Sequence, residues 1–197
     1  MDSSVCPFVP HLAKLIRARN EFASRHQRET TTVQDLDIWL VLIAFIVLCL
    51  GVGFAGSIAT RQSVRDWYPT LRKPAGTPPG WVFGPVWTAL YILMAIAAWM
   101  VWRDVGWQIA RYPLILFFGQ LALNLAWSGI FFGSRNPGFA LAEIVVLWLA
   151  IAATALFFWY YVPLAGALML PYLAWVTYAS YLNFGIWRLN PPQRSAG

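Results

Sequence analysis

Long apolar runs follow one another along this chain after a polar beginning. Residues 1–37 are polar and mixed in charge, and five apolar runs of 21 to 25 residues come after them. The runs cover residues 38–58, 81–102, 112–133, 138–159 and 163–187. At about 1.5 Å of rise per residue, each run is long enough for a helix to cross the roughly 30 Å hydrocarbon core of a bilayer. The pattern predicts an all-α integral membrane protein, a bundle of five transmembrane helices over residues 38–190.

The connections between the later runs are short. Residues 136–138 read Asn-Pro-Gly, which predicts a turn, and Tyr161 and Val162 leave almost no loop before the fifth run. The last two helices are therefore expected to form a tight antiparallel hairpin. Pro171 lies in the middle of the fifth run, where proline is expected to kink the helix.

The first connection has a different character. The 22 residues at 59–80 include prolines and glycines that favour extended and turn conformations, at Pro69, Pro74, Gly76, Pro78, Pro79 and Gly80. The same stretch carries Trp67 and Tyr68, whereas a flexible linker is polar and poor in aromatic residues. We therefore expect a structured loop between the first two helices, covering something beneath it.

Composition supports a membrane protein and limits its partners. Hydrophobic residues make up 59% of the chain and charged residues 11%, which is outside the range of soluble domains. The net charge of +6 comes from Lys and Arg in the tails and loops, so nucleic-acid binding is not expected. The positive charges near the span ends favour a cytoplasmic position for the long loop and the C-terminus.

The two tails have no chemistry of their own in the sequence. Residues 1–37 contain no signal peptide, and two interpretations stay open: a solvated, partly disordered tail, or a weak apolar face lying on the membrane surface. Residues 191–197 form a short C-terminal tail. Cys6 and Cys49 lie in such different surroundings that no disulfide is expected.

The apolar runs lack the residues that catalysis or metal binding would need. Both histidines, His11 and His26, are in the N-terminal tail, which argues against a haem with an axial histidine. No nucleophile motif, phosphate-binding loop or metal-ligand spacing occurs. The prediction is no catalytic residue, no metal and no bound cofactor, although an enzymatic role stays open.

Polar and aromatic residues of several runs converge at one depth. Counted from the run ends nearest the long loop, similar levels are reached by Trp87, Asn124, Trp127, Phe139, Glu143, Trp175, Ala179 and Asn183. Glu143 is the single acidic residue within any run, and a carboxylate inside a membrane is a candidate functional group. Alternatively, the Asn and Glu side chains hydrogen-bond between helices as packing contacts, or Glu143 reaches water near the interface.

Apart from Trp67 in the 59–80 stretch, the 12 tryptophans divide into two groups. Those at the span ends fit an interfacial belt, namely Trp39, Trp81, Trp102, Trp107, Trp159 and Trp187. Those lying deeper either pack between helices or line a cavity for a flat apolar molecule, namely Trp87, Trp99, Trp127, Trp148 and Trp175.

Four segments carry a family resemblance. They read WYPTLRKP at 67–74, PPGWVFGPVWTALY at 78–91, GQLALNLAWSGIFFG at 119–133 and PYLAWVTYASYLNFGIWRLN at 171–190. In these segments the chain resembles the TspO/MBR family, the tryptophan-rich sensory proteins and translocator proteins, also called peripheral-type benzodiazepine receptors. The resemblance implies five transmembrane helices, a homodimer, and a pocket under the first long loop. It also implies porphyrin ligands such as protoporphyrin IX, with cholesterol and benzodiazepine-site drugs in some members.

Carried over position by position, the resemblance implies ligand contacts at Tyr68, Trp87, Asn124, Trp127, Trp175, Ala179 and Leu182. Together with the depth argument, the candidate set is completed by Tyr91, Phe139, Glu143 and Asn183. Two departures are evident. Phe139 stands where animal members have a pocket tryptophan, and Phe184 replaces the tyrosine of the cholesterol motif, so sterol specificity is not predicted.

The resulting functional hypothesis is a membrane receptor or carrier that binds a tetrapyrrole or a similar flat, lipid-like molecule. Two alternatives stay open: an enzyme that degrades porphyrin by photo-oxidation, and a structural or assembly subunit of a membrane complex. A bacterial inner membrane is the expected location, with the mitochondrial outer membrane as the alternative.

Overall fold

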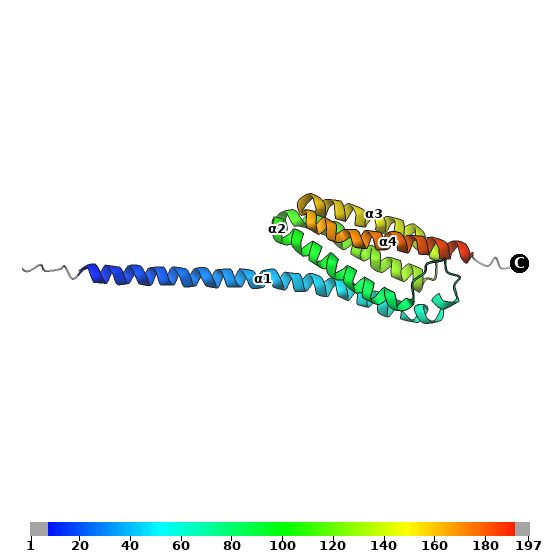
Figure 1. Ribbon diagram of the computed structural model, residues 1–197, viewed down its shortest axis with the longest axis horizontal. Helices are drawn as coiled ribbons and strands as arrows, with labels where there is room; N and C mark the ends of the chain where they lie inside the picture. The colour runs from blue at the N-terminus through cyan, green and yellow to red at the C-terminus, as the bar shows by residue number, and fades with distance from the viewer. Residues whose placement is uncertain (1–7, 192–197) are drawn as a thin grey trace, which may run out of the picture. The chain divides into compact units, whose positions relative to one another are not determined.

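A computed structural model describes residues 8–191, with side chains from residue 37 onward. Every element in that range is helical: α1 (Phe8–Asp66), the 3₁₀ turn η1 (Tyr68–Thr70), α2 (Gly80–Ser128), the π-helical turn η2 (Gly129–Gly133), α3 (Pro137–Tyr161) and α4 (Pro163–Leu189) (Figure 1). The chain divides into two units, residues 1–41 and 42–197, and each is described by itself. The described part of the first unit is the beginning of α1, and the cavity discussed below lies in the second.

The N-terminal stretch is helical wherever the structure describes it. From Phe8 the backbone is part of α1, although the sequence suggested a tail that is disordered or lies on the membrane surface. Residues 1–7, and residues 192–197 of the C-terminal tail, lie outside the described part of the chain. Placement on a membrane surface stays a prediction.

Helix α2 contains the second predicted run and the third as far as Ser128, and η2 contains the rest of the third. Gly106, with φ 71° and ψ 165°, is the one residue of α2 with a non-helical backbone, and such a positive φ is readily adopted by glycine. Two contacts, Tyr91 to Asn124 and Met94 to Gln120, pair residues that are almost symmetric about Gly106. The chain therefore reverses there, and the two segments of α2 lie side by side, as Figure 1 shows.

The predicted count of five separate helices is thus not confirmed. The described residues form four α-helices, because the stretch between the second and third runs, expected as a loop, stays helical up to and beyond Gly106. An all-helical architecture is confirmed.

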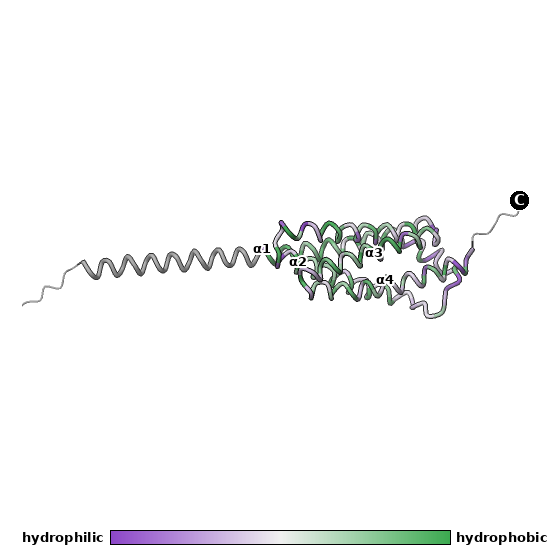
Figure 2. The backbone as a smooth tube through the Cα atoms, turned by 90° about the horizontal axis from the view of Figure 1, so that it is seen from above, coloured by the Kyte–Doolittle hydropathy of each residue, from purple (hydrophilic) through white to green (hydrophobic). Residues whose placement is uncertain are grey.

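Length and composition qualify three helical stretches to cross a membrane. They are Asp37–Asp66 of α1, Gly80–Gly133 of α2 with η2, and Pro137–Tyr161, which is α3. Large apolar side chains cover their outward faces, among them Val47, Phe54, Ile115, Leu149 and Leu156. Figure 2 shows hydrophobic residues along the helices and hydrophilic ones mainly towards their ends. The protein is therefore an integral membrane protein.

Helix α4 is not among the stretches that are apolar enough to qualify as a membrane span, although it coincides with the fifth predicted run. Its sequence carries Trp175, Thr177, Tyr178, Ser180 and Asn183, which lower its hydropathy. Proline at position 163 begins the helix directly after Val162, the single residue between α3 and α4. A Cβ at Gly166 would lie 2.6 Å from the backbone of Trp159, so the two helices approach as closely as the predicted tight hairpin requires.

The loop between α1 and α2, residues 67–79, is shorter than the sequence suggested. The prediction of a loop over 59–80 is wrong in extent, because α1 continues through Asp66. Arg65 lies in the last turn of α1, where a cation stabilises the helix end, and Pro69 follows shortly after. We call residues 67–79 the lid loop.

Helix α4 holds the lid loop in place (Figure 1). The Asn190 side chain accepts a hydrogen bond from the Arg72 amide at 3.0 Å and donates one to the Arg72 carbonyl at 2.9 Å. The Tyr178 hydroxyl donates to the carbonyl of Gly76, whose φ of 85° suits glycine. Pro74 packs against Gly185, where a Cβ would come within 2.7 Å of the proline ring. The loop is thus an ordered structure, as predicted.

Candidate functional site

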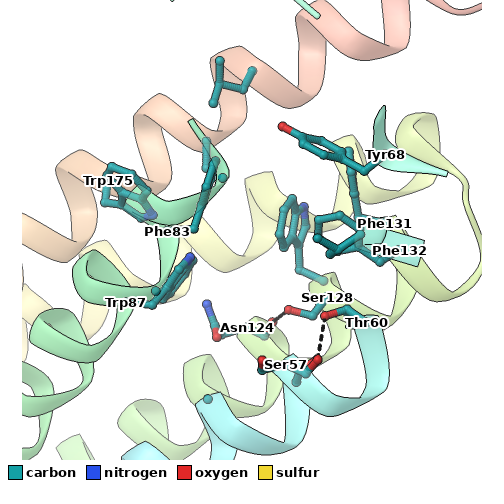
Figure 3. A pocket seen from close by; sticks show the side chains of 18 of the residues that line it. Ser57, Thr60, Tyr68, Phe83, Trp87, Asn124, Ser128, Phe131, Phe132 and Trp175 are labelled. Atoms are coloured by element: carbon teal, nitrogen blue, oxygen red, sulfur yellow. Dashed lines mark hydrogen bonds between the residues drawn. The ribbon is translucent and has the colours of Figure 1, made fainter. Parts of the chain in front are cut away.

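A cavity of about 1020 Å³ lies beneath the lid loop. Its lining comes from α1, the lid loop, both segments of α2, η2 and α4 (Figure 3). Helix α3 contributes no lining residue, because its buried side chains, such as Ile144, Leu147 and Ile151, belong to the packed core of the bundle. The fourth run, which also carries residues at the predicted depth, is therefore not part of the lining.

One wall of the cavity is aromatic and comes from α2 and α4. Phe83 meets Trp175 edge to face, with ring centroids 5.9 Å apart. One turn further along α2, Trp87 lies 5.6 Å from Tyr91 and 6.0 Å from the buried Tyr172. These contacts orient the Trp87 and Trp175 rings from both helices and leave an apolar surface towards the cavity.

A second aromatic wall lies on the opposite side of the pocket in Figure 3. Trp127 stacks on Phe131 with ring centroids 5.1 Å apart, and Phe131 meets Phe132 at 4.8 Å. Tyr68 of the lid loop lies 5.8 Å from Phe132. Phe131 and Phe132 belong to η2, whose wider turn is evident from the Ser134 amide bonding to the carbonyl of Gly129, five residues back.

Most polar groups of the lining already have partners. The hydroxyls of Thr60 and Thr88 donate to carbonyls of their own helices at 2.8 and 2.9 Å. The Tyr91 hydroxyl donates to Asn124 Oδ1 at 2.7 Å, which joins the two segments of α2 at the side of the cavity. Two buried lining atoms have no protein partner: Trp127 Nε1, a donor, and Asn183 Oδ1, an acceptor. Both atoms are closed off from the cavity, and the Asn183 side-chain amide instead donates a hydrogen bond to the carbonyl of Pro137 at 2.9 Å.

Charge enters the lining at one position. Lys73, in the lid loop, is the single ionisable side chain of the lining apart from tyrosines, and its ammonium lies 4.7 Å from the centre of the Tyr68 ring. Burial and the neighbouring Tyr178 raise the pKa of the Tyr68 phenol above its usual value, so Tyr68 is neutral at physiological pH. The site is therefore apolar and aromatic, with one cation in the lid loop that covers it.

Nine of the eleven predicted ligand-binding residues line this cavity: Tyr68, Trp87, Tyr91, Asn124, Trp127, Trp175, Ala179, Leu182 and Asn183. Phe139 and Glu143, both on α3, do not. The Phe139 side chain is 62% exposed, and its backbone amide is capped by Asn136 Oδ1 at 3.0 Å. Both carboxylate oxygens of Glu143 are buried without a hydrogen-bond partner. Ligand contact by the nine stays a prediction.

The lining also includes residues that were not predicted, among them Lys73, Phe83, Phe131 and Phe132. Phe83 precedes Trp87 by four residues on one helix, and that spacing puts both on one face. The two phenylalanines stand between Gly129 and Gly133, and nothing in the pattern reveals that the helix changes pitch there. Within the part of the chain that the structure describes, no three His, Cys, Asp or Glu side chains come together as a metal site requires.

These features define a class: a helical integral membrane protein with an aromatic cavity under an ordered, proline-rich loop. Comparison with known sequences narrows it further, since the TspO/MBR family model matches residues 45–188. The chain belongs to the TspO/MBR family, as its sequence motifs predicted.

Relatives from distant organisms share most of the chain. The tryptophan-rich protein TspO of Archaeoglobus fulgidus is 44% identical over 151 residues, which are 77% of this chain and 97% of that protein. The translocator protein of Homo sapiens is 43% identical over 139 residues, 70% of this chain and 82% of that protein. The tryptophan-rich sensory protein of Cereibacter sphaeroides is 38% identical over 152 residues, 77% of this chain and 92% of that protein. Residues 1–44 lie outside the family match.

Proposed function

We propose that this protein is a membrane receptor or carrier that binds a flat apolar tetrapyrrole, such as protoporphyrin IX, in the cavity under the lid loop. The main support is the cavity itself. At about 1020 Å³ it lies at the upper end of the range of about 300–1,000 Å³ typical of small-molecule sites, so it accommodates a large ligand.

The shape of the lining agrees with a flat ligand. Trp87 and Trp175 stand on one side, and Phe131 and Phe132 on the other, so a planar molecule between them has ring faces or edges on both sides (Figure 3). Aromatic groups attract each other in stacked and edge-to-face arrangements.

The names of relatives suggest what binding accomplishes. One relative is called a translocator protein and another a sensory protein, which fits a role in the transport, sensing or sequestration of the bound molecule. The ordered lid loop suits each of these roles, since it covers part of the cavity.

The topology and assembly are part of the same proposal. Helix α2 reverses at Gly106, so it crosses the membrane twice and, with α1, α3 and α4, makes five crossings. The lid loop then faces the cytoplasm, and the membrane is the inner membrane of a bacterium. The protein acts as a homodimer. Light scattering of the protein in detergent measures the mass of that dimer directly.

The test is an absorbance titration of protoporphyrin IX with purified protein in a neutral detergent. We expect a saturable shift of the porphyrin band at about one porphyrin per chain. Replacing Trp87 by Leu removes a ring from the cavity and should weaken binding about 2- to 12-fold, because an aromatic contact contributes about 0.5–1.5 kcal/mol beyond area burial.

The matched control is Trp159→Leu, since the Trp159 side chain is 51% exposed and does not line the cavity. It should bind porphyrin as the parent does. If the parent shows no saturable binding, or if Trp87→Leu and Trp159→Leu lose affinity equally, the cavity is not a porphyrin site.

A further inference from the structure

Lys73 is placed where an apolar site has no need of a charge. It lies in the lid loop, and every other lining residue is apolar, aromatic or uncharged polar. Its side chain is half-buried, so the ammonium is partly withdrawn from water. Long cationic side chains usually keep the charged end solvated, and one that lines a cavity instead needs a reason.

No carboxylate of the described residues compensates this charge. Within residues 37–191, the Lys73 ammonium makes no ion pair, and its contact is with the ring face of Tyr68 at 4.7 Å. The Tyr68 phenol is neutral, as shown above, and the lining contains neither Asp nor Glu. The cation therefore faces the cavity with a ring beneath it and no anion beside it.

We propose that Lys73 binds an anionic group of the ligand, and that the ligand is an amphipathic carboxylate. This rests on the proposed tetrapyrrole function and deepens it. The apolar body lies between the two aromatic walls, and the carboxylate lies under the lid loop beside the ammonium. Binding thus has a fixed orientation, with the acid end towards the lid loop and the body towards Asn124.

Two features of the site agree with that orientation. The Thr60 and Thr88 hydroxyls, on the α1 and α2 sides, already donate to carbonyls of their own helices, so they offer little to an anion. Lys73 is the one cation of the lining, and its ammonium lies over the ring of Tyr68 in the lid loop.

The experiment compares protoporphyrin IX, which carries two carboxylates, with its uncharged dimethyl ester. Both are titrated into the parent protein, Lys73→Met and Lys73→Arg in a detergent without anionic lipid. Lys73→Met keeps the length of the side chain and removes the charge. We expect Lys73→Met to bind the diacid about fivefold or more weakly than the parent does, because the lost contact is a charge-assisted one. Its affinity for the ester should equal that of the parent. Lys73→Arg should restore diacid binding to within about threefold.

The ester also reports whether each variant is folded, since it occupies the same cavity without using the charge. Equal affinity of parent and Lys73→Met for the diacid would overturn the proposal, as would an equal loss for diacid and ester. Failure of both porphyrins to bind the parent would instead overturn the proposed function itself.

Discussion

Replacing Asn190 by Ala should release the lid loop from α4. Two of the hydrogen bonds made by the Asn190 side chain go to the amide and carbonyl of Arg72, at 3.0 and 2.9 Å. Each such bond contributes about 0.5–1.5 kcal/mol net, so losing both costs the closed loop about 1–3 kcal/mol. That energy raises the population of the open loop about 5- to 150-fold. The effect should be local, because Asn190 is the C-terminal cap of α4 and lies outside the packed core.

Amide hydrogen exchange measures this opening directly. The amides of Thr70, Leu71 and Thr77 bond to carbonyls within the lid loop, at 3.0, 3.4 and 3.4 Å, so they exchange when the loop loosens. We expect faster exchange for peptides covering residues 67–79 and unchanged exchange in α3. Arg188→Ala is the control, since Arg188 lies on the last turn of α4 and its guanidinium contacts Phe184 rather than the loop. Unchanged exchange in Asn190→Ala, or equal acceleration in Arg188→Ala, would refute the assignment of Asn190 as the anchor.

Two further substitutions test the space inside the bundle. Ala179→Phe places a ring in the cavity and should lower porphyrin affinity at least about tenfold, or about 1.4 kcal/mol. Ala174→Phe, at an exposed position outside the lining, should bind porphyrin as the parent does. Equal affinities of the two variants would show that the ligand does not bind in this cavity. Gly53→Ala brings a Cβ against the Tyr91 ring, 2.8 Å from Cδ2, and should lower stability in detergent by about 1–3 kcal/mol. Gly51→Ala, which meets nothing within 4 Å, should show no loss in the same thermal melt; a loss as large as that of Gly53→Ala would contradict the packing argument.

Much of the fold could be predicted from the lengths of the hydrophobic runs, because a chain that crosses a bilayer must satisfy its own backbone hydrogen bonds and a helix does so. Run length does not reveal what happens between runs. Gly106 turns the chain with one residue, so the expected loop is helical, and α1 continues past its apolar part to Asp66. Both errors arise because polar residues near a membrane surface are as compatible with a helix as with a loop.

The candidate site was partly accessible for a similar reason. The depth of a residue can be counted along its helix. That count predicted similar depths for Trp87, Asn124 and Trp175, which all line the cavity. The facing direction of a helix depends on its neighbours, and α3 does not present Glu143 to this cavity. Lys73 was missed because charge in a loop is ordinary, and only the path of the lid loop places it over the cavity.

The attachment of the lid loop to α4 also imposes an order on biosynthesis. Arg72 is synthesised 118 residues before Asn190, and Gly76 is synthesised 102 residues before Tyr178. A nascent chain that has inserted only α1, α2 and α3 therefore has incomplete aromatic walls, and its lid loop is not yet held by α4. The cavity is therefore complete only after α4, which supplies Trp175 and Ala179 to the lining and the contacts that hold the lid loop, has joined the other helices.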